Sequence, residues 1–156
     1  HYEERKHILL GKAMIVAYSR PIGIKIYKKI LSLKSQWKEN LKPVMTTTND
    51  DPEEWRNILG TSEKRKELAF EFKKSNSDFI ALVVDMWLTG FDVPSLNTMY
   101  IYKPLSGHNL MQTISRVNRA YKDKEGGLIV DYIGLASSLK EALSNNTKEI
   151  MKDTEN

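Results

Sequence analysis

The sequence predicts an α/β fold in which a doubly wound, mostly parallel sheet carries helices on both faces, in three layers. The apolar run at 79–84 is continuous rather than alternating, as in a central parallel strand that helices cover on both sides. Short strand-like runs alternate along the chain with segments of helical periodicity, which is the pattern of right-handed strand–helix–strand units. The 156 residues, 40% of them hydrophobic, suffice for the core of one domain.

The first thirty residues are predicted to form a helix, a strand and a second helix. Residues 2–10 mix charged and apolar side chains and end at Gly11, which suits the left-handed cap of a helix. Residues 12–18 contain an apolar run bounded by polar residues, and we expect a strand buried on both faces. Residues 19–21 then turn the chain into a helix, since proline is favoured at the first helical position. Isoleucine recurs every four residues along this helix, at positions 22, 26 and 30.

The remaining chain continues the alternation of strands and helices. A strand is expected at 43–48, an acidic loop at 49–54 and a charged helix at 62–74. In the charged helix the basic residues are interleaved with glutamates, which favours a solvated face over a nucleic-acid patch. The later elements are expected at 79–84, 98–102 and 128–131 for strands, and at 108–120 and 135–143 for helices.

The predicted domain organisation has three parts. Residues 1–11 form a helical lead-in from a preceding domain or linker, residues 12–143 form the α/β domain, and residues 144–156 form a polar tail or a linker to a following domain. No apolar window approaches the roughly 20 residues that cross a bilayer, so no membrane span is expected. The absence of cysteine excludes disulfides and thiolate metal sites and fits a reducing cytoplasm. The three histidines are too scattered for a zinc helix, and we expect no metal site in this chain.

The helix at 108–120 has two chemically different faces. Gln112, Arg116 and Arg119 are four and three residues apart, so they fall within about 60° of one another on one side of the helix. The apolar residues of this helix repeat the same spacing on the opposite side. A solvated helix surface fits this pattern, because arginine is mostly exposed. A phosphate site fits it as well, because guanidinium groups place paired donors on phosphate oxygens. The helix by itself does not decide between the two.

Three segments resemble motifs of superfamily 2 helicases and translocases. The segment QTISRVNR at 112–119 resembles motif VI, the segment 83–94 resembles motif V with its GxD core at Gly90 and Asp92, and the segment 13–21 is similar to motif IV. Their order is that of a second RecA-like motor lobe. The segments TGFDVP at 89–94 and KPLSGHNLMQ and onward at 103–134 more narrowly resemble the R subunit of type I restriction enzymes.

The resemblance implies roles for particular residues. Arg116 and Arg119 are expected to reach the γ-phosphate of ATP, and Gln112 is expected to sense closure of the cleft between two lobes. Gly90 and Asp92 are expected to link the nucleotide to DNA. The contacts to the DNA backbone are expected at Ser19, Arg20 and Thr89, since strand-to-helix loops offer amide donors to phosphate. Many relatives have glycine where this chain has Ser115 and Asn118, so its backbone is expected to approach the nucleotide differently. Many also have threonine where this chain has Val84, so a hydroxyl contact to phosphate is expected to be lost there and to be replaced by Thr89 or by backbone amides.

A phosphate-binding P-loop is missing from the sequence. The nearest candidate, Gly11-Lys12, has lysine six residues before the motif lysine instead of glycine and alanine instead of serine or threonine after it. ATP and Mg²⁺ are therefore expected to be held mainly by a P-loop lobe of the same parent chain, and this lobe alone is expected to be inactive. The resemblance further implies duplex DNA and the modification and specificity subunits as partners, in a bacterial or archaeal cytoplasm. A lobe of another superfamily 2 DNA or RNA helicase, or a non-catalytic nucleic-acid-binding module, remains an alternative.

Overall fold

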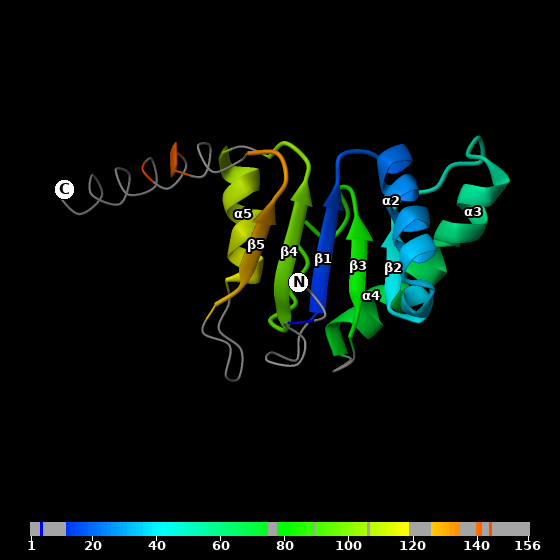
Figure 1. Cartoon of the computed structure of the whole chain (residues 1–156), viewed down its shortest axis with the longest axis horizontal. Helices are drawn as coiled ribbons and strands as arrows, with labels where there is room; N and C mark the ends of the chain where they lie inside the picture. Colours follow the sequence, from blue (N-terminus) through cyan, green and yellow to red (C-terminus); the bar gives the residue numbers. More distant parts are fainter. Residues whose placement is uncertain are drawn as a thin grey trace.

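The protein folds around a five-stranded sheet whose strands lie in the order β2-β3-β1-β4-β5. The computed structural model describes residues 4, 12–74, 78–88, 90–105, 107–118, 126–134, 140, 141 and 144. All the strand pairings are parallel, so the five arrowheads in Figure 1 point the same way. The strands are β1 (Lys12–Ala17), β2 (Leu41–Val44), β3 (Ile80–Val83), β4 (Leu96–Tyr102) and β5 (Leu128–Asp131). The expected parallel α/β sheet is confirmed.

Strand β1 occupies the middle of the sheet. It pairs with β3 on one side, where Met14 lies opposite Ala81, and with β4 on the other, where Met14 lies opposite Met99. Every residue of β1 except Ile15 is buried. A continuous apolar run is favoured in such a strand because both of its faces are covered.

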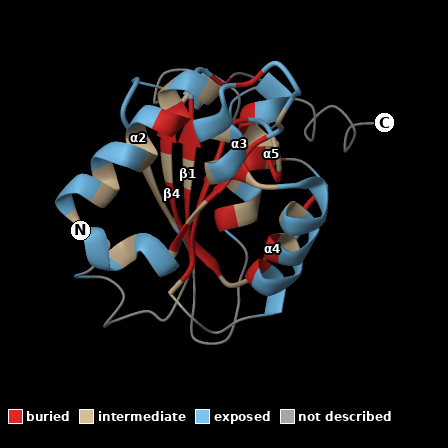
Figure 2. Cartoon of the chain, turned by 90° about the vertical axis from the view of Figure 1, so that its right-hand side faces the viewer, coloured by how far each residue is buried: buried red, intermediate tan, exposed pale blue. Residues whose placement is uncertain are grey.

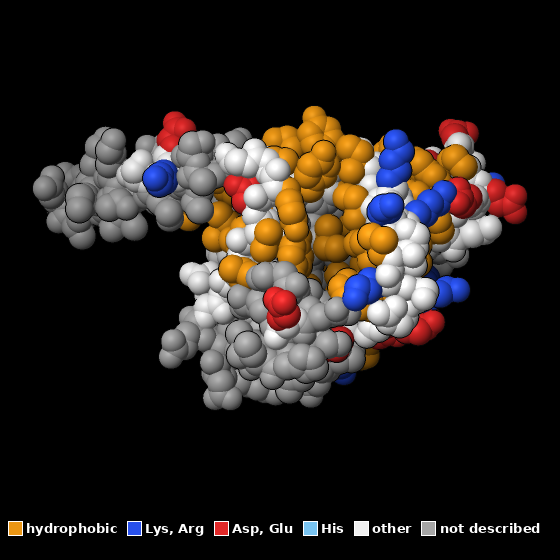
Figure 3. All heavy atoms as spheres, viewed as in Figure 1, with side chains coloured by type: hydrophobic (Ala, Val, Ile, Leu, Met, Phe, Trp, Pro, Cys, Tyr) orange, Lys and Arg blue, Asp and Glu red, His pale blue; other side chains and the backbone are white. Residues whose placement is uncertain are grey.

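One face of the sheet is covered by α2 (Arg20–Leu33), the 3₁₀ helix η1 (Ser35–Glu39) and α3 (Glu53–Leu59). Ile26 and Ile30 of the predicted stripe pack against this core, and the isoleucine of α2 that is fully buried in it is Ile24. Figure 2 shows the buried residues gathered along the strands and the exposed residues on the outer sides of the helices. The described helices leave part of the face open over β1 and β4. An apolar groove of about 600 Å³ lies there, lined by Ile15, Ile30, Tyr100, Tyr132 and neighbouring side chains, and its hydrophobic atoms are visible in Figure 3.

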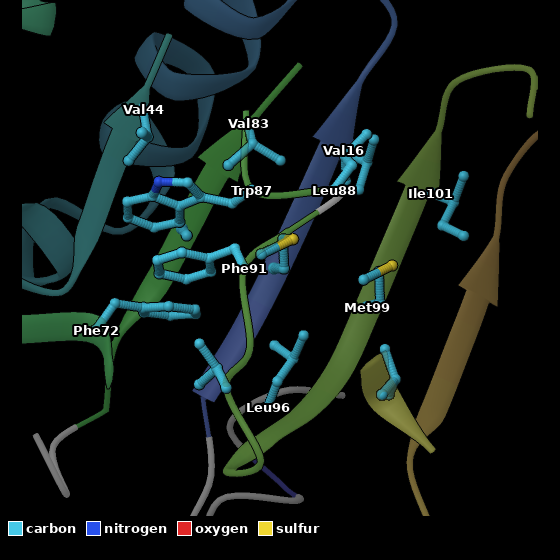
Figure 4. Close-up of a cluster of buried hydrophobic side chains, with 14 of the residues drawn as sticks. Val16, Val44, Phe72, Val83, Trp87, Leu88, Phe91, Leu96, Met99 and Ile101 are labelled. Carbon is cyan, nitrogen blue, oxygen red and sulfur yellow. The ribbon is translucent and has the colours of Figure 1, made fainter. Parts of the chain in front are cut away.

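The opposite face is covered by α4 (Ser62–Lys74), α5 (Gly107–Val117) and the connection 84–95 between β3 and β4. Aromatic rings dominate this core. Trp87 stacks on Phe91 with ring centroids 4.5 Å apart, and Phe72 of α4 stacks on Trp87 at 5.2 Å. Figure 4 shows these three rings on the same side of the sheet as Val16 of β1 and Met99 of β4.

The connection 84–95 runs from β3 past β1 to β4, and its described residues form turns and bends without helix. The sequence analysis expects no helix between the strands at 79–84 and 98–102, and the described residues agree with it. Trp87, Leu88, Phe91 and Val93 are buried here, so the loop itself supplies the apolar layer that a crossover helix normally provides.

Other element boundaries differ locally from those expected. Strand β2 begins at Leu41 and ends at Val44, two residues earlier than expected at its start; as an edge strand it accommodates Pro43. The expected acidic loop at 49–54 contains the start of α3, whose first turn carries Glu53 and Glu54. Carboxylates are favoured there by the helix dipole. The expected helices at 2–10 and 135–143 fall outside the described residues, apart from Glu4, Lys140 and Glu141, which are helical. No helix among the described residues is long and apolar enough to cross a bilayer.

Candidate functional site

The strands of a parallel sheet all end at the same edge, and the residues after them form one continuous loop surface. Ser19 follows β1, Thr46 follows β2, Asp85 follows β3 and Lys103 follows β4. This edge lies at the top of Figure 1. The segments 13–21 and 83–94 and helix α5 all reach this edge. Arg116 lies farther down, toward the starts of the strands, because the adjacent Val117 packs against Gly127 just before β5.

Ser19 and Arg20 form the junction between β1 and α2. Ser19 has an extended backbone, its side chain makes no capping hydrogen bond, and its carbonyl accepts a hydrogen bond from the Gly23 N–H at 2.8 Å. The Arg20 Nη1 donates to Asp51 Oδ2 at 2.6 Å and to the Thr46 carbonyl at 3.0 Å. Arg20 thus ties the start of α2 to the loop that follows β2.

Asp51 is the partner that organises this loop. Its Oδ2 also accepts a hydrogen bond from the Thr48 N–H at 2.8 Å, and its side chain is only 7% exposed. Hydrogen bonds from Arg20 and from the Thr48 backbone hold the pKa of the Asp51 carboxyl below its ordinary value. The sequence analysis placed Asp51 in an acidic loop and gave it no role. Its place in the loop that follows β2, at the edge where the strands end, is the signal that could have marked it as a site residue.

Lys103 joins the ends of β3 and β4 across β1. Its Nζ donates to the Val84 carbonyl at 3.0 Å and forms an ion pair with Asp85. The sequence analysis did not single out this pair as a site. It fixes the start of the connection that carries the GxD core of motif V.

Within that connection, Gly90 has a positive φ of 66°, and a Cβ built on it would meet no atom within 4 Å. Glycine is required there by the backbone conformation rather than by crowding. Gly90 and Asp92 are both exposed, while Phe91 between them is buried. Thr89 lies outside the described residues.

Helix α5 places one arginine of the segment that resembles motif VI, Arg116, against this connection. The Arg116 Nε donates to the Leu88 carbonyl at 2.8 Å, and its Nη1 donates to the Phe91 carbonyl. Gln112 lies one turn earlier, with its Nε2 at 2.6 Å from the His108 Nε2. Leu110, Thr113 and Val117 form the buried side of α5, close to the face that the spacing predicts. Arg119 lies outside the described residues.

The structure therefore brings Arg116 together with the loop of Gly90 and Asp92. Arg20 belongs to α2 on the opposite face of the sheet and forms a separate group with Asp51. Among the described residues, no three histidine or carboxylate side chains gather as a metal site requires. The Arg116 guanidinium lies beside the loop of Gly90 and Asp92, and the described residues contain no carboxylate cluster of the kind that binds Mg²⁺.

Comparison with solved structures identifies the fold. The C-terminal domain of the DEAD-box protein Dbp5 matches with a TM-score of 0.55 and 16% identity, over 96% of this chain and 75% of that one. The C-terminal part of the Fun30 ATPase domain matches with a TM-score of 0.54 and 13% identity, over 90% of this chain and 43% of that one. The fold is that of a RecA-like helicase C-terminal lobe.

Comparison of sequences identifies the family. The putative type I restriction enzyme MjaIXP endonuclease subunit of Methanocaldococcus jannaschii is 46% identical over 98% of this chain, and the HindI endonuclease subunit of Haemophilus influenzae is 40% identical over 97%. The chain spans 15% of the length of each of these relatives. The family model for domain 3 of the type I restriction enzyme subunit R matches residues 29–134. The chain therefore belongs to the family of type I restriction enzyme R subunits, in the part described as domain 3-like.

Proposed function

We propose that the chain is the second motor lobe of an ATP-dependent DNA translocase within a type I restriction enzyme R subunit. The observation that carries the proposal is the contact between Arg116 of α5 and the loop that holds Gly90 and Asp92. In a chain of this family and fold, that contact places a guanidinium of motif VI directly against motif V. A direct contact of this kind would let a change at the nucleotide site move the loop that is proposed to face DNA.

Within the proposed motor, ATP and Mg²⁺ are held mainly by a P-loop lobe of the same parent chain. Arg119 and Arg116 approach the γ-phosphate from this lobe, where charge spreads over the equatorial oxygens as the phosphoryl group is transferred. Arg116 uses its Nε and Nη1 on the loop, and its Nη2 bears two further N–H groups for phosphate. Gln112, one helical turn before Arg116, senses closure of the two lobes.

Duplex DNA is proposed to lie across the strand-end loops. Ser19, at the start of α2, offers a hydroxyl and a helix N-terminus to a backbone phosphate, and Thr89 offers a hydroxyl beside Gly90. Arg20 shares its charge with Asp51, so in this structure it supports the loop and adds less positive potential than a lone arginine would. Gly90 and Asp92 transmit the state of the nucleotide to these contacts.

The parent protein is proposed to be the ATP-dependent endonuclease subunit of a restriction complex, together with modification and specificity subunits, in the cytoplasm of a bacterium or archaeon. The relatives named above are endonuclease subunits, which supports this assignment. The lobe alone is proposed to be inactive, because the sequence contains no P-loop.

The proposal is tested by Arg119→Ala in the full-length parent protein. We expect DNA-stimulated ATP turnover to fall by at least about a hundredfold, because an arginine that stabilises a phosphoryl-transfer transition state contributes about 10³ to 10⁵ in rate. Arg119→Lys should restore little, since a point charge cannot reproduce the planar two-donor fork. The measurement is ATP hydrolysis with and without duplex DNA, beside a melting curve for each variant.

Arg56→Ala is the matched control, because Arg56 is an exposed arginine on α3 at the other face of the sheet. It should leave turnover unchanged. Unchanged turnover in a folded Arg119→Ala protein would remove the phosphate role of motif VI from the proposal. Stimulation by RNA instead of duplex DNA would favour a helicase lobe of another kind.

A further inference from the structure

The connection 84–95 has a conformation that needs external support. Trp87 has a positive φ of 69°, a region that a bulky side chain rarely adopts. Gly90 adopts a similar φ of 66° three residues later. Residues held in such conformations persist only where the surrounding structure over-determines them. The contacts around this loop therefore decide where Gly90 and Asp92 stand.

Two sets of contacts hold the loop. The first is the aromatic stack of Phe72 of α4, Trp87 and Phe91, in which all three pairs of rings are stacked and the centroids lie 4.5 to 6.2 Å apart. Figure 4 shows the three rings one above another. This stack anchors the side chains of the loop in the core and leaves its backbone carbonyls to other partners.

The second set comes from one side chain of α5. Arg116 donates to the carbonyls of Leu88 and Phe91, which lie on either side of Gly90. Because the guanidinium is planar and rigid, it fixes the separation of the two carbonyls as well as their positions. Gly90 therefore lies between two carbonyls that one side chain holds.

We propose that Arg116 is a positioning residue that holds the motif V loop by these two carbonyls and so fixes the place of Gly90 and Asp92. The importance of this role in the motor rests on the proposed function. The role itself is additional to a phosphate contact, because it concerns the backbone of the loop and not the nucleotide. A pure phosphate contact leaves the loop unchanged when it is removed. A positioning residue releases the loop even when neither ATP nor DNA is present.

The test uses Trp87 as a reporter in the 156-residue chain. Trp37→Phe and Trp55→Phe leave Trp87 as the single tryptophan, and Trp87 is only 8% exposed. Arg116→Ala should increase acrylamide quenching of Trp87, because losing hydrogen bonds from a charged donor raises the open population of the loop by roughly tenfold or more. Arg116→Lys should not restore the protection, since one ammonium cannot bridge both carbonyls in a fixed plane.

Arg116→Gln is the second variant, because its amide donates to one carbonyl at most and it removes less volume than alanine does. It should also increase quenching. Arg56→Ala, on the far face, should leave quenching at the wild-type value, and circular dichroism melting shows which variants are folded. Wild-type quenching in folded Arg116→Ala or Arg116→Gln protein, complete rescue by Arg116→Lys, or an equal rise in Arg56→Ala overturns the inference.

Activity in the full-length protein separates this inference from the proposed function. Arg116→Ala should reduce the stimulation of kcat by DNA together with the rise in quenching, because the loop loses its support; a change in the KM for ATP reports the separate phosphate contact of the Nη2 group. A large rise in KM together with unchanged quenching identifies Arg116 as a nucleotide contact only and overturns the inference. The quenching experiment involves neither ATP nor DNA, so its outcome stands whether or not Arg119→Ala supports the motor assignment.

Discussion

At the scale of a residue, the Asp51 carboxylate joins the loop after β2 to the start of α2. The pKa of this carboxyl is lower in the folded protein than in the unfolded chain, because the charged form accepts hydrogen bonds from Arg20 and Thr48 only when the protein is folded. Ionised Asp51 therefore stabilises the fold. The stabilisation is present above the unfolded pKa of about 3.9 and is lost as the pH falls through the folded value. We expect Asp51→Asn to unfold at lower urea concentration than the wild type at pH 7, and the difference to shrink below about pH 4.

Asp50→Asn provides the matched control for this pH dependence, because Asp50 is exposed and lies next to Asp51 in the sequence. It should shift the urea midpoint much less at pH 7. Urea titrations of both variants at pH 7, 5 and 3 carry the comparison. A difference between Asp51→Asn and the wild type that persists unchanged at pH 3 contradicts the role of the charged carboxylate.

At the scale of an element, the end of α5 lies directly against the start of β5. A Cβ built on Gly127 would collide with the Val117 carbonyl and side chain, so glycine is needed for this close approach. Because the obstacle includes backbone, Gly127→Ala should force α5 and β5 apart and lower the free energy of unfolding by about 1 to 3 kcal/mol. Chemical denaturation of both proteins measures the change.

The neighbouring glycine is the control for this prediction. A Cβ on Gly126 would lie 3.2 Å from the Asn118 Oδ1, a side-chain atom that can move. Gly126→Ala should change stability by no more than about 0.5 kcal/mol, or raise it slightly by restricting the unfolded chain. Equal losses from the two substitutions would show that the approach of α5 to β5 does not decide the outcome.

At the scale of the whole molecule, the net charge of +4 and the missing P-loop predict a lobe that binds polyanions weakly and does no chemistry by itself. We expect the isolated chain to bind duplex DNA without sequence preference. Its affinity should fall steeply with salt, since each phosphate contact releases counterions and contributes about −0.9 to the slope of log K against log salt. Fluorescence anisotropy from 50 to 200 mM salt tests this range. Salt-insensitive, sequence-selective binding would favour the binding-module alternative, and DNA-stimulated ATP turnover by the purified chain would contradict the lobe assignment.

The elements that the sequence determined by itself are those with strong local patterns. The apolar runs of β1, β3 and β5, the periodicity of α2 and α5 and the charged helix α4 lie close to where they were predicted, because the order of apolar and polar side chains reports burial locally. The motif residues could be placed on strand ends and on α5 for the same reason. The short α3 and η1 were missed because one or two turns carry too little periodicity to identify.

Only the tertiary structure decided which segments meet. The order of the strands, the course of the connection 84–95 past β1 and the bonds from Arg116 to Leu88 and Phe91 join positions far apart in the chain. The ion pair of Arg20 with Asp51 likewise spans 31 positions. Local side-chain patterns record whether a residue is buried but not which distant backbone group becomes its partner. Such partners meet only when the strands pair and helices and loops cover both faces of the sheet. In this protein that packing brings Arg116 of α5 to the carbonyls of Leu88 and Phe91 in the connection between β3 and β4.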